Sequence, residues 1–78
     1  MKLLVRNLAR TTTEAEVLAL FEAHGTVEYC TLVMDAESGQ SKGFGFVEMP
    51  QESEANAAIA DLNGQKIDKS KIRVKPAQ

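Results

Sequence analysis

Two segments with apolar residues three or four positions apart predict helices, over residues 13–24 and 52–63. Thr13 precedes the first, and Glu16 follows it at the spacing of a capping box. Gly25 is a typical helix stop. The apolar stripes consist of Val17, Leu20 and Phe21 in the first helix and of Ala55, Ala58, Ile59 and Leu62 in the second.

Four other segments have the composition or the alternation of β-strands, over residues 3–5, 27–34, 42–49 and 71–75. A turn-rich loop is expected between the second and third, and a polar turn at residues 65–70 before the last. The order is strand-helix-strand-strand-helix-strand. This order predicts an α+β, ferredoxin-like βαββαβ fold, in which two helices cover one face of a four-stranded antiparallel sheet and leave the other face to solvent.

The segment 42–49 carries two of the three phenylalanines, Phe44 and Phe46, on one face of its strand. The strand pattern alone allows both rings to be buried or both to be exposed. Lys42 shares their face and is costly to bury, whereas Val47 and Met49 point the other way. The helices should therefore cover Val47 and Met49, and the rings should lie on the open face.

The net charge of the 78 residues is −2, which by itself argues against a nucleic-acid partner. The charges are segregated, however, with acids on the predicted helices and bases on the predicted strands. Alternation puts the basic residues on the open side of their strands, so the sheet face should be positive and the helical face negative. An ordinary soluble surface is the alternative. The bases on strands are Lys2, Arg6, Lys42, Lys71, Arg73 and Lys75, against Glu28 and Glu48.

The remaining composition indicates a small single domain, residues 1–78, without catalytic or metal chemistry. Cys30 is the sole cysteine and lies in an apolar run, so we expect a buried structural thiol in a reducing compartment. His24 should end the first helix. One Cys and one His cannot build a zinc site without carboxylates, and no cofactor or metal is expected. No membrane span or secretory signal is visible, which predicts a cytoplasmic location.

These features together resemble the RNA recognition motif, over essentially the whole chain. Residues 42–49 match seven of the eight positions of the longer ribonucleoprotein motif of that family. Residues 3–8 approximate its shorter motif, an aliphatic–aromatic–aliphatic triplet followed by any residue and Asn-Leu. Further similarities lie at Phe21, Gly25, the loop 35–41, Leu62-Asn63-Gly64 and Ile72-Arg73-Val74. The short chain looks like the stand-alone members found in bacteria.

The resemblance implies that single-stranded RNA binds across the sheet. Phe46 would stack on a base, Phe44 would pack against sugars, and Lys42 would contact a phosphate. Tyr29 would offer a further stacking surface, unless a bulge near Val27 turns it away. Arg73 and Lys75, with the tail through Gln78, would flank the bound strand. Arg6, on the open side of its strand, is a further candidate for RNA binding.

One departure from the family motif bears on binding, because Leu4 stands where the open face usually carries Phe or Tyr. A leucine cannot stack on a base, and one base–aromatic contact is worth roughly 1–3 kcal/mol. The affinity should therefore be modest, and Leu4→Tyr should increase it. Met49 replaces a core-facing aromatic and should be neutral for binding.

Two other classes of function remain open. A protein-interaction module built on the same fold would fit the acidic helices and the pI near 5.3. An enzyme is the weaker alternative. Small hydrolases such as acylphosphatases share the topology, but no acid–base pair or phosphate-binding loop is visible in this chain. Single-stranded DNA is a further candidate ligand, because stacking rings do not distinguish the sugars. The protein is expected to be a monomer.

Overall fold

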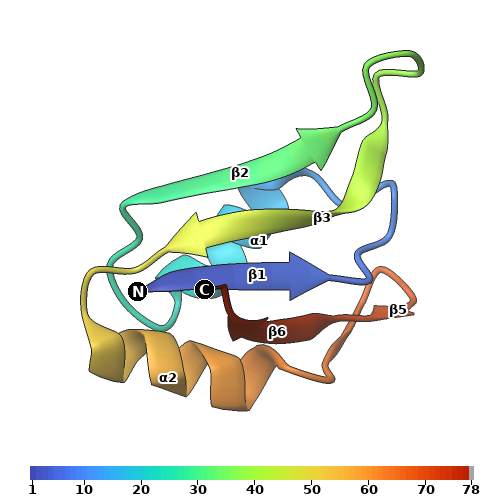
Figure 1. Cartoon of the computed structure of the whole chain (residues 1–78). Helices are drawn as coiled ribbons and strands as arrows, with labels where there is room; N and C mark the ends of the chain where they lie inside the picture. Colours follow the sequence, from blue (N-terminus) through green and yellow to red (C-terminus); the bar gives the residue numbers. More distant parts are fainter. Residues whose placement is uncertain (78) are drawn as a thin grey trace.

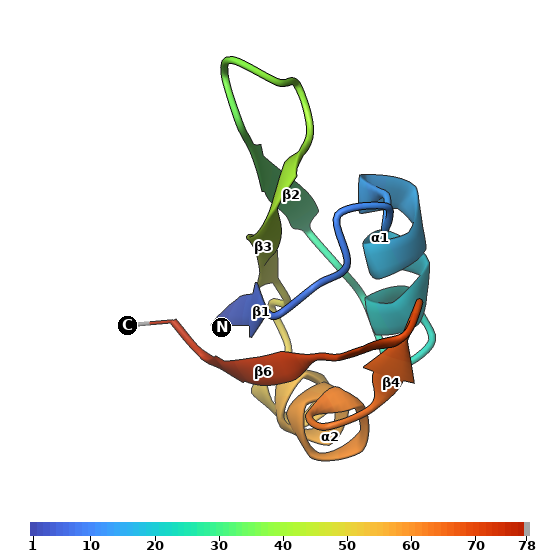
Figure 2. The same cartoon turned by 90° about the vertical axis from the view of Figure 1, so that its right-hand side faces the viewer.

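The computed structural model describes residues 1–77, which form one four-stranded antiparallel sheet with two helices on one face (Figures 1 and 2). The strand order is β2-β3-β1-β6, and a short hairpin, β4-β5, lies outside this sheet. The predicted α+β architecture is confirmed. The elements are β1 (Lys2–Arg6), α1 (Glu14–Glu22), β2 (Tyr29–Met34), β3 (Ser41–Glu48), α2 (Glu52–Leu62), β4 (Lys66–Ile67), β5 (Ser70–Lys71) and β6 (Arg73–Pro76).

The register of the sheet places residues from all four strands in one row across the open face. Leu4 of β1 lies opposite Phe46 of β3 and opposite Lys75 of β6. Phe46 in turn lies opposite Thr31 of β2. Because side chains directly opposite each other lie on the same face of a sheet, the row runs Thr31, Phe46, Leu4, Lys75. Leu4 is thus at the centre of the open face.

The core lies between the other face of the sheet and the two helices. Val47 and Met49 are fully buried there, which confirms the orientation predicted for β3. Both predicted stripes face this core, with Leu20 and Ile59 packed at its margin and the other five residues buried. The strands, the loop after β1 and the residue between β5 and β6 contribute Leu3, Val5, Leu8, Leu32, Ile72 and Val74.

The helix ends follow the sequence signals closely. Thr13 Oγ1 accepts a hydrogen bond from the Glu16 amide at 3.2 Å, and the Glu16 carboxylate accepts one from the Thr13 amide at 3.0 Å. This pair is the predicted capping box. The end of α2 is tied to the sheet, because Asn63 Oδ1 accepts a hydrogen bond from the Val74 amide at 3.0 Å. Within residues 1–77, neither helix is long and apolar enough to span a membrane.

The prediction of one continuous last strand over residues 71–75 was wrong. Ile72 is fully buried and separates β5 from β6, and its backbone bonds to residues 64 and 65 instead of the sheet. The predicted polar turn at 65–70 is part of the β4-β5 hairpin, whose Asp68 and Lys69 have φ angles of 50° and 70°. Such left-handed pairs close two-residue hairpins. Lys71 therefore lies outside the four-stranded sheet.

Cys30 is half-buried and not fully buried as expected. It belongs to β2, an edge strand, and its side chain packs at the margin of the core. Its thiol lies 3.9 Å from the Glu14 carbonyl oxygen, to which it donates. Partial burial, with the nearby Glu14 carboxylate, raises the pKa of Cys30 to about 11. The thiol is therefore protonated at neutral pH.

Candidate nucleic-acid interface

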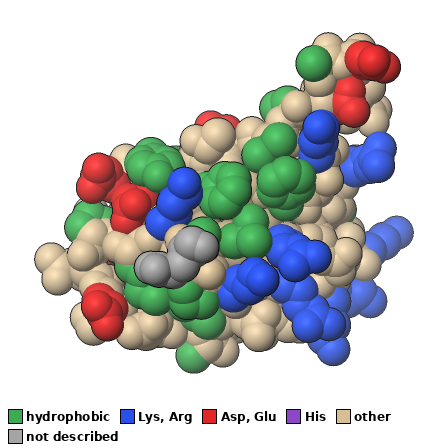
Figure 3. Space-filling model, in the orientation of Figure 1, with side chains coloured by type: hydrophobic (Ala, Val, Ile, Leu, Met, Phe, Trp, Pro, Cys, Tyr) green, Lys and Arg blue, Asp and Glu red, His purple; other side chains and the backbone are tan. Residues whose placement is uncertain are grey.

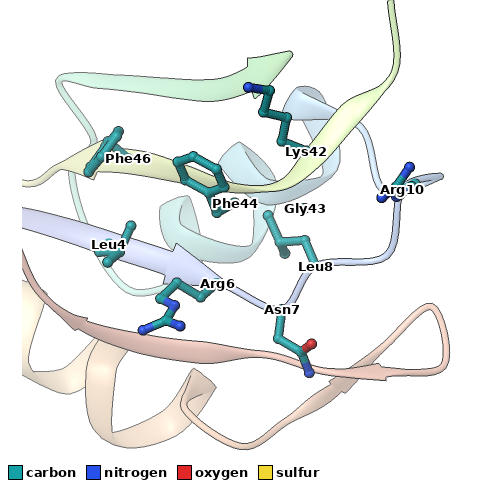
Figure 4. A pocket seen from close by; sticks show the side chains of 9 residues that line it. All are labelled: Leu4, Arg6, Asn7, Leu8, Arg10, Lys42, Gly43, Phe44 and Phe46. Carbon is teal, nitrogen blue, oxygen red and sulfur yellow. The ribbon is translucent and has the colours of Figure 1, made fainter. Parts of the chain in front are cut away.

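The two phenylalanine rings of β3 lie on the open face and are half-buried (Figure 4). Their centroids are 6.3 Å apart and their planes meet at 87°, an edge-to-face arrangement. Bases stacked along one strand are roughly parallel, so perpendicular rings cannot both stack on neighbouring bases in the same way. Phe44 and Phe46 therefore offer different contacts. This geometry agrees with the different tasks expected for the two rings.

A hollow of about 600 Å³ opens beside Phe44 and combines an apolar floor with three cationic side chains (Figure 4). Arg6 reaches it from β1, Arg10 from the loop before α1, and Lys42 from β3. Such a combination suits a nucleotide, with an apolar base or sugar and an anionic phosphate. The other lining residues are Leu4, Asn7, Leu8, Gly43, Phe44 and Phe46.

The loop after β1 is held in a fixed shape, and this positions Arg6 and Arg10. Asn7 adopts a left-handed φ of 60°, and its side-chain amide donates to the Lys71 carbonyl oxygen at 2.7 Å. One residue later, the Leu8 amide donates to the Gly43 carbonyl oxygen at 2.8 Å. The wall of the hollow is thus held by contacts of the loop after β1 with β3 and β5.

Strand β3 is irregular next to Lys42. Leu32 lies opposite Gly45 but Met34 lies opposite Ser41, so β3 contains two additional residues over this interval. Gly43 lies within it and has a φ of 85°, which favours glycine. Irregularities of this kind bend a strand and redirect side chains, often beside binding sites. Lys42 and Phe44 flank Gly43 and both line the 600 Å³ hollow.

Gly45 faces the buried side of β3, so it does not open space around the rings. A Cβ at this position would clash with the Thr31 carbonyl oxygen and approach Leu32 Cδ2 to 2.8 Å. The glycine therefore allows β2 to lie close against β3. Thr31 is also the residue opposite Phe46, so this close contact lies directly beneath the ring surface.

Basic side chains surround the apolar centre of the open face, and acidic ones lie at its margins (Figure 3). Arg73 and Lys75 are exposed on β6, and Arg6 lies opposite Arg73. In the part of the chain that the structure describes, the ion pairs involve the Met1 ammonium and His24, and none uses these side chains. Their charges are therefore free to meet an external anion.

Tyr29 lies on the open face and is 42% exposed. The Glu28 amide donates to the Glu48 carbonyl oxygen at 2.8 Å, so two residues of this segment face Glu48, yet Tyr29 keeps its register opposite Glu48 and stays on the open face. Tyr29 lies opposite Glu48, whose carboxylate is 2.7 Å from the Met1 ammonium. The Met1 ammonium thus balances the charge of the acid opposite Tyr29.

The structure brings most of the expected residues together and adds three. Leu4, Arg6, Lys42, Phe44 and Phe46 line one hollow, with Arg73 and Lys75 on β6 and Tyr29 at the edge. The expected contribution of Gln78 lies outside the described residues. The additional residues are Lys2, Asn7 and Arg10.

None of these three was predicted as a site residue. Asn7 belongs to the shorter motif, but the sequence does not show that its side chain holds the loop through Lys71. Lys2 was recognised as a strand cation, but its contact with Phe46 depends on a side-chain conformation that alternation cannot give. Arg10 lies in a loop, where no periodicity indicates direction. The signal that could have found Arg10 is a lone cation two residues after the end of the shorter motif.

The sequence of the chain is similar to those of known RNA-binding proteins. A family model described as RNA recognition motif matches residues 3–73. A chloroplastic 28 kDa ribonucleoprotein of Nicotiana sylvestris is 42% identical over 99% of this chain and 28% of its own length. A glycine-rich RNA-binding protein of Mycosarcoma maydis is 41% identical over 97% of this chain and 43% of its own length.

Two solved structures are similar to this chain in both fold and sequence. A crystal structure named RNA binding protein PG1 has a TM-score of 0.94 at 38% identity, covering 99% of this chain and 93% of that one. An Sxl-lethal protein/RNA complex has a TM-score of 0.93 at 32% identity, covering 99% of this chain and 46% of that one.

These relatives correct two expectations. The sequence was expected to resemble stand-alone bacterial members, but the curated relatives are plant and fungal proteins, and the chain spans less than half of their length. Several of them are named as chloroplastic, which does not support a plain cytoplasmic location.

Proposed function

Because the chain belongs to the RNA recognition motif family, we propose that residues 1–78 form one binding domain, monomeric and without catalytic activity, for single-stranded RNA. The observation that carries this proposal is the pair of perpendicular, half-exposed phenylalanine rings at the centre of a face rich in free cations. Aromatic rings stack on unpaired bases, and nearby cations neutralise the phosphates.

Each side chain of the face has a distinct task in this proposal. Phe46 stacks on a base, and Phe44, perpendicular to it, packs against the neighbouring sugar. Lys42 contacts a phosphate at the 600 Å³ hollow, where Arg10 and Arg6 add charge. Arg73 and Lys75 guide the strand along β6, and Tyr29 contributes at the far edge of the sheet.

The affinity in this proposal is modest because Leu4 occupies the central position of the face. The missing base–aromatic contact corresponds to roughly 1–3 kcal/mol. A difference of 1.4 kcal/mol is tenfold in Kd. The domain should therefore bind short RNA about tenfold or more weakly than a counterpart with an aromatic residue at position 4.

The proposal is tested by removing each ring separately. Phe46→Ala and Phe44→Ala are titrated against a fluorescently labelled pool of short single-stranded RNAs at fixed salt, by anisotropy. We expect about tenfold or greater weakening for Phe46→Ala, from the loss of stacking. Both rings are half-buried, so each variant should also lose about 1 kcal/mol of stability, and far-UV spectra and melting curves must confirm folding.

Met34→Ala is the matched control for these variants. Met34 is 52% exposed and lies on β2, away from the rings, so its removal deletes a similar exposed apolar side chain without touching the proposed site. RNA titrations that are the same for wild type and both folded phenylalanine variants would refute RNA binding by this face.

Two alternative partners are separated by mapping amide chemical-shift changes. RNA on the open face should shift residues 42–47 and their neighbours in β1 and β6. A protein partner on the acidic helices would shift residues 14–22 and 52–62 instead, and such shifts without any from RNA would favour an interaction module. A DNA oligonucleotide of the same sequence shows whether the sugar is distinguished.

A further inference from the structure

The centre of the open face contains a second hollow, of about 360 Å³, at the position where the family motif usually carries a ring. Its floor is Leu4, one wall is Phe46, and Pro76 and Ala77 lie on the β6 side. Two lysines complete the lining, Lys2 from β1 and Lys75 from β6. The register explains this convergence, because Leu4 lies opposite both Phe46 and Lys75.

Lys2 also covers the ring that the proposed function assigns to base stacking. Its Nζ lies 4.7 Å from the centroid of Phe46, a cation–π contact. A stacked base approaches a ring at van der Waals distance, about 3.5–4.0 Å between carbon atoms. The ammonium and a base therefore cannot occupy the same face of Phe46. Lys2 has to move when a base stacks there.

The charge around this hollow is positive. No carboxylate is among the lining residues in the described part of the chain. Glu48 lies opposite Lys2 on β3, but its carboxylate is bound by the Met1 ammonium at 2.7 Å. Leu4 offers no π surface, so a base gains little here, whereas two ammonium groups suit a phosphate.

We propose that a backbone phosphate of the bound RNA occupies this hollow, held between Lys2 and Lys75. This inference rests on the proposed function. It states which group of the RNA binds at the central position of the open face. When a base stacks on Phe46, Lys2 exchanges its contact with the ring for an ion pair with the adjacent phosphate. The chain thus replaces the usual central stacking contact by an ionic one.

The salt dependence of RNA affinity tests this assignment, because each phosphate neutralised on a single strand contributes about 0.7 to the slope of log K against log [salt]. Slopes are measured for wild type, Lys2→Gln, Lys75→Gln and the double variant. If both lysines hold the same phosphate, the double variant should flatten the slope by about 0.7, and not by twice that value. Each single variant should flatten it by part of this amount.

The matched control is Lys66→Gln with Lys69→Gln, which removes the same charge from exposed positions at the β4-β5 hairpin, away from the open face (Figure 2). Its slope should equal that of wild type. Unchanged slopes in both Lys2→Gln and Lys75→Gln would overturn the assignment, as would an effect equal to that of the control. A tighter Lys2→Gln with an unchanged slope would show that Lys2 only covers the ring.

Leu4→Tyr provides an independent arm, because a ring at position 4 fills the hollow. It should tighten binding at high salt by stacking and should flatten the slope by about 0.7 through loss of the phosphate. Its advantage over wild type should then grow about 2.6-fold for each fourfold increase in salt. A tighter Leu4→Tyr with the wild-type slope would overturn the phosphate assignment and leave RNA binding intact. Absence of RNA binding by wild type would instead refute the proposed function itself.

Discussion

A histidine connects the ends of the two helices and makes part of the stability of the domain depend on pH. His24 Nε2 lies 2.7 Å from the Asp61 carboxylate, and His24 Nδ1 lies 3.0 Å from the Leu20 carbonyl oxygen. Both partners can only accept hydrogen bonds, so both ring nitrogens are best satisfied as donors, in the protonated imidazolium. These bonds raise the pKa of His24, with Asp61 as the main cause.

The sign of the pH effect follows from this direction. The pKa of His24 is higher in the folded state than the value of 6.5 that applies when the chain is unfolded. The contribution to stability is therefore complete below about pH 6.5 and is lost as the pH rises through the folded-state pKa. The melting temperature of wild type should decrease over this interval relative to variants without the pair.

The expected size is small because the pair is partly in solvent, with 18% of the His24 side chain and 61% of the Asp61 side chain exposed. Exposed ion pairs contribute about 0.2–1 kcal/mol. For a domain of this size, 1 kcal/mol shifts the melting temperature by about 4–8 °C. Asp61→Asn should therefore lower the melting temperature at pH 6 by about 1–8 °C and have little effect at pH 9.

The assay is thermal unfolding, followed by circular dichroism, of wild type, His24→Gln, Asp61→Asn and the double variant between pH 5.5 and 9. The double-mutant cycle isolates the pair from the other titrating groups. We expect a coupling energy that is present at low pH and is lost as the pH rises through the raised pKa of His24. A coupling energy that is the same at pH 6 and pH 9 would show that the pair does not depend on protonation of His24.

Three further changes have definite expected outcomes. Thr13→Ala removes the capping box and should cost about 1 kcal/mol in urea unfolding, whereas Thr13→Ser should preserve stability. Gly45→Ala pushes a methyl group against the Thr31 carbonyl oxygen and should cost about 1–3 kcal/mol; a melting temperature equal to wild type would disprove this close contact. Cys30, with a pKa of about 11, should react with iodoacetamide at pH 7.5 far more slowly in the folded protein than in urea, and equal rates would contradict its protection.

The helices and the orientation of β3 could be predicted because local chemistry determines them. Thr13 and Glu16 form the capping box at the residues where their spacing indicated it. Lys42 and Glu48 are costly to bury, and this predicted that Phe44 and Phe46 lie on the open face. The capping box joins residues that are close in sequence. The orientation of β3 depends only on which face of the strand is buried.

The last strand and the details of the site could not be predicted from patterns. Alternation over residues 71–75 is the same for one strand and for two strands divided at a buried Ile72, and only tertiary contacts decide between them. The 87° angle between the rings and the position of Lys2 over Phe46 depend on side-chain rotamers, which the sequence pattern does not specify.

The separation of acidic helices from a basic sheet gives the domain a preferred orientation of approach, in spite of its net charge of −2. The molecule measures 37 × 22 × 21 Å, so even its short dimensions span between two and three Debye lengths at physiological salt, where that length is about 8 Å. A polyanion near the sheet then interacts mainly with the lysines and arginines of the sheet face. At 0.01 M salt the Debye length is about 30 Å, and the acids of the helices are felt as well. Encounter rates with RNA should therefore depend less steeply on salt at low ionic strength than the count of basic residues on the sheet suggests.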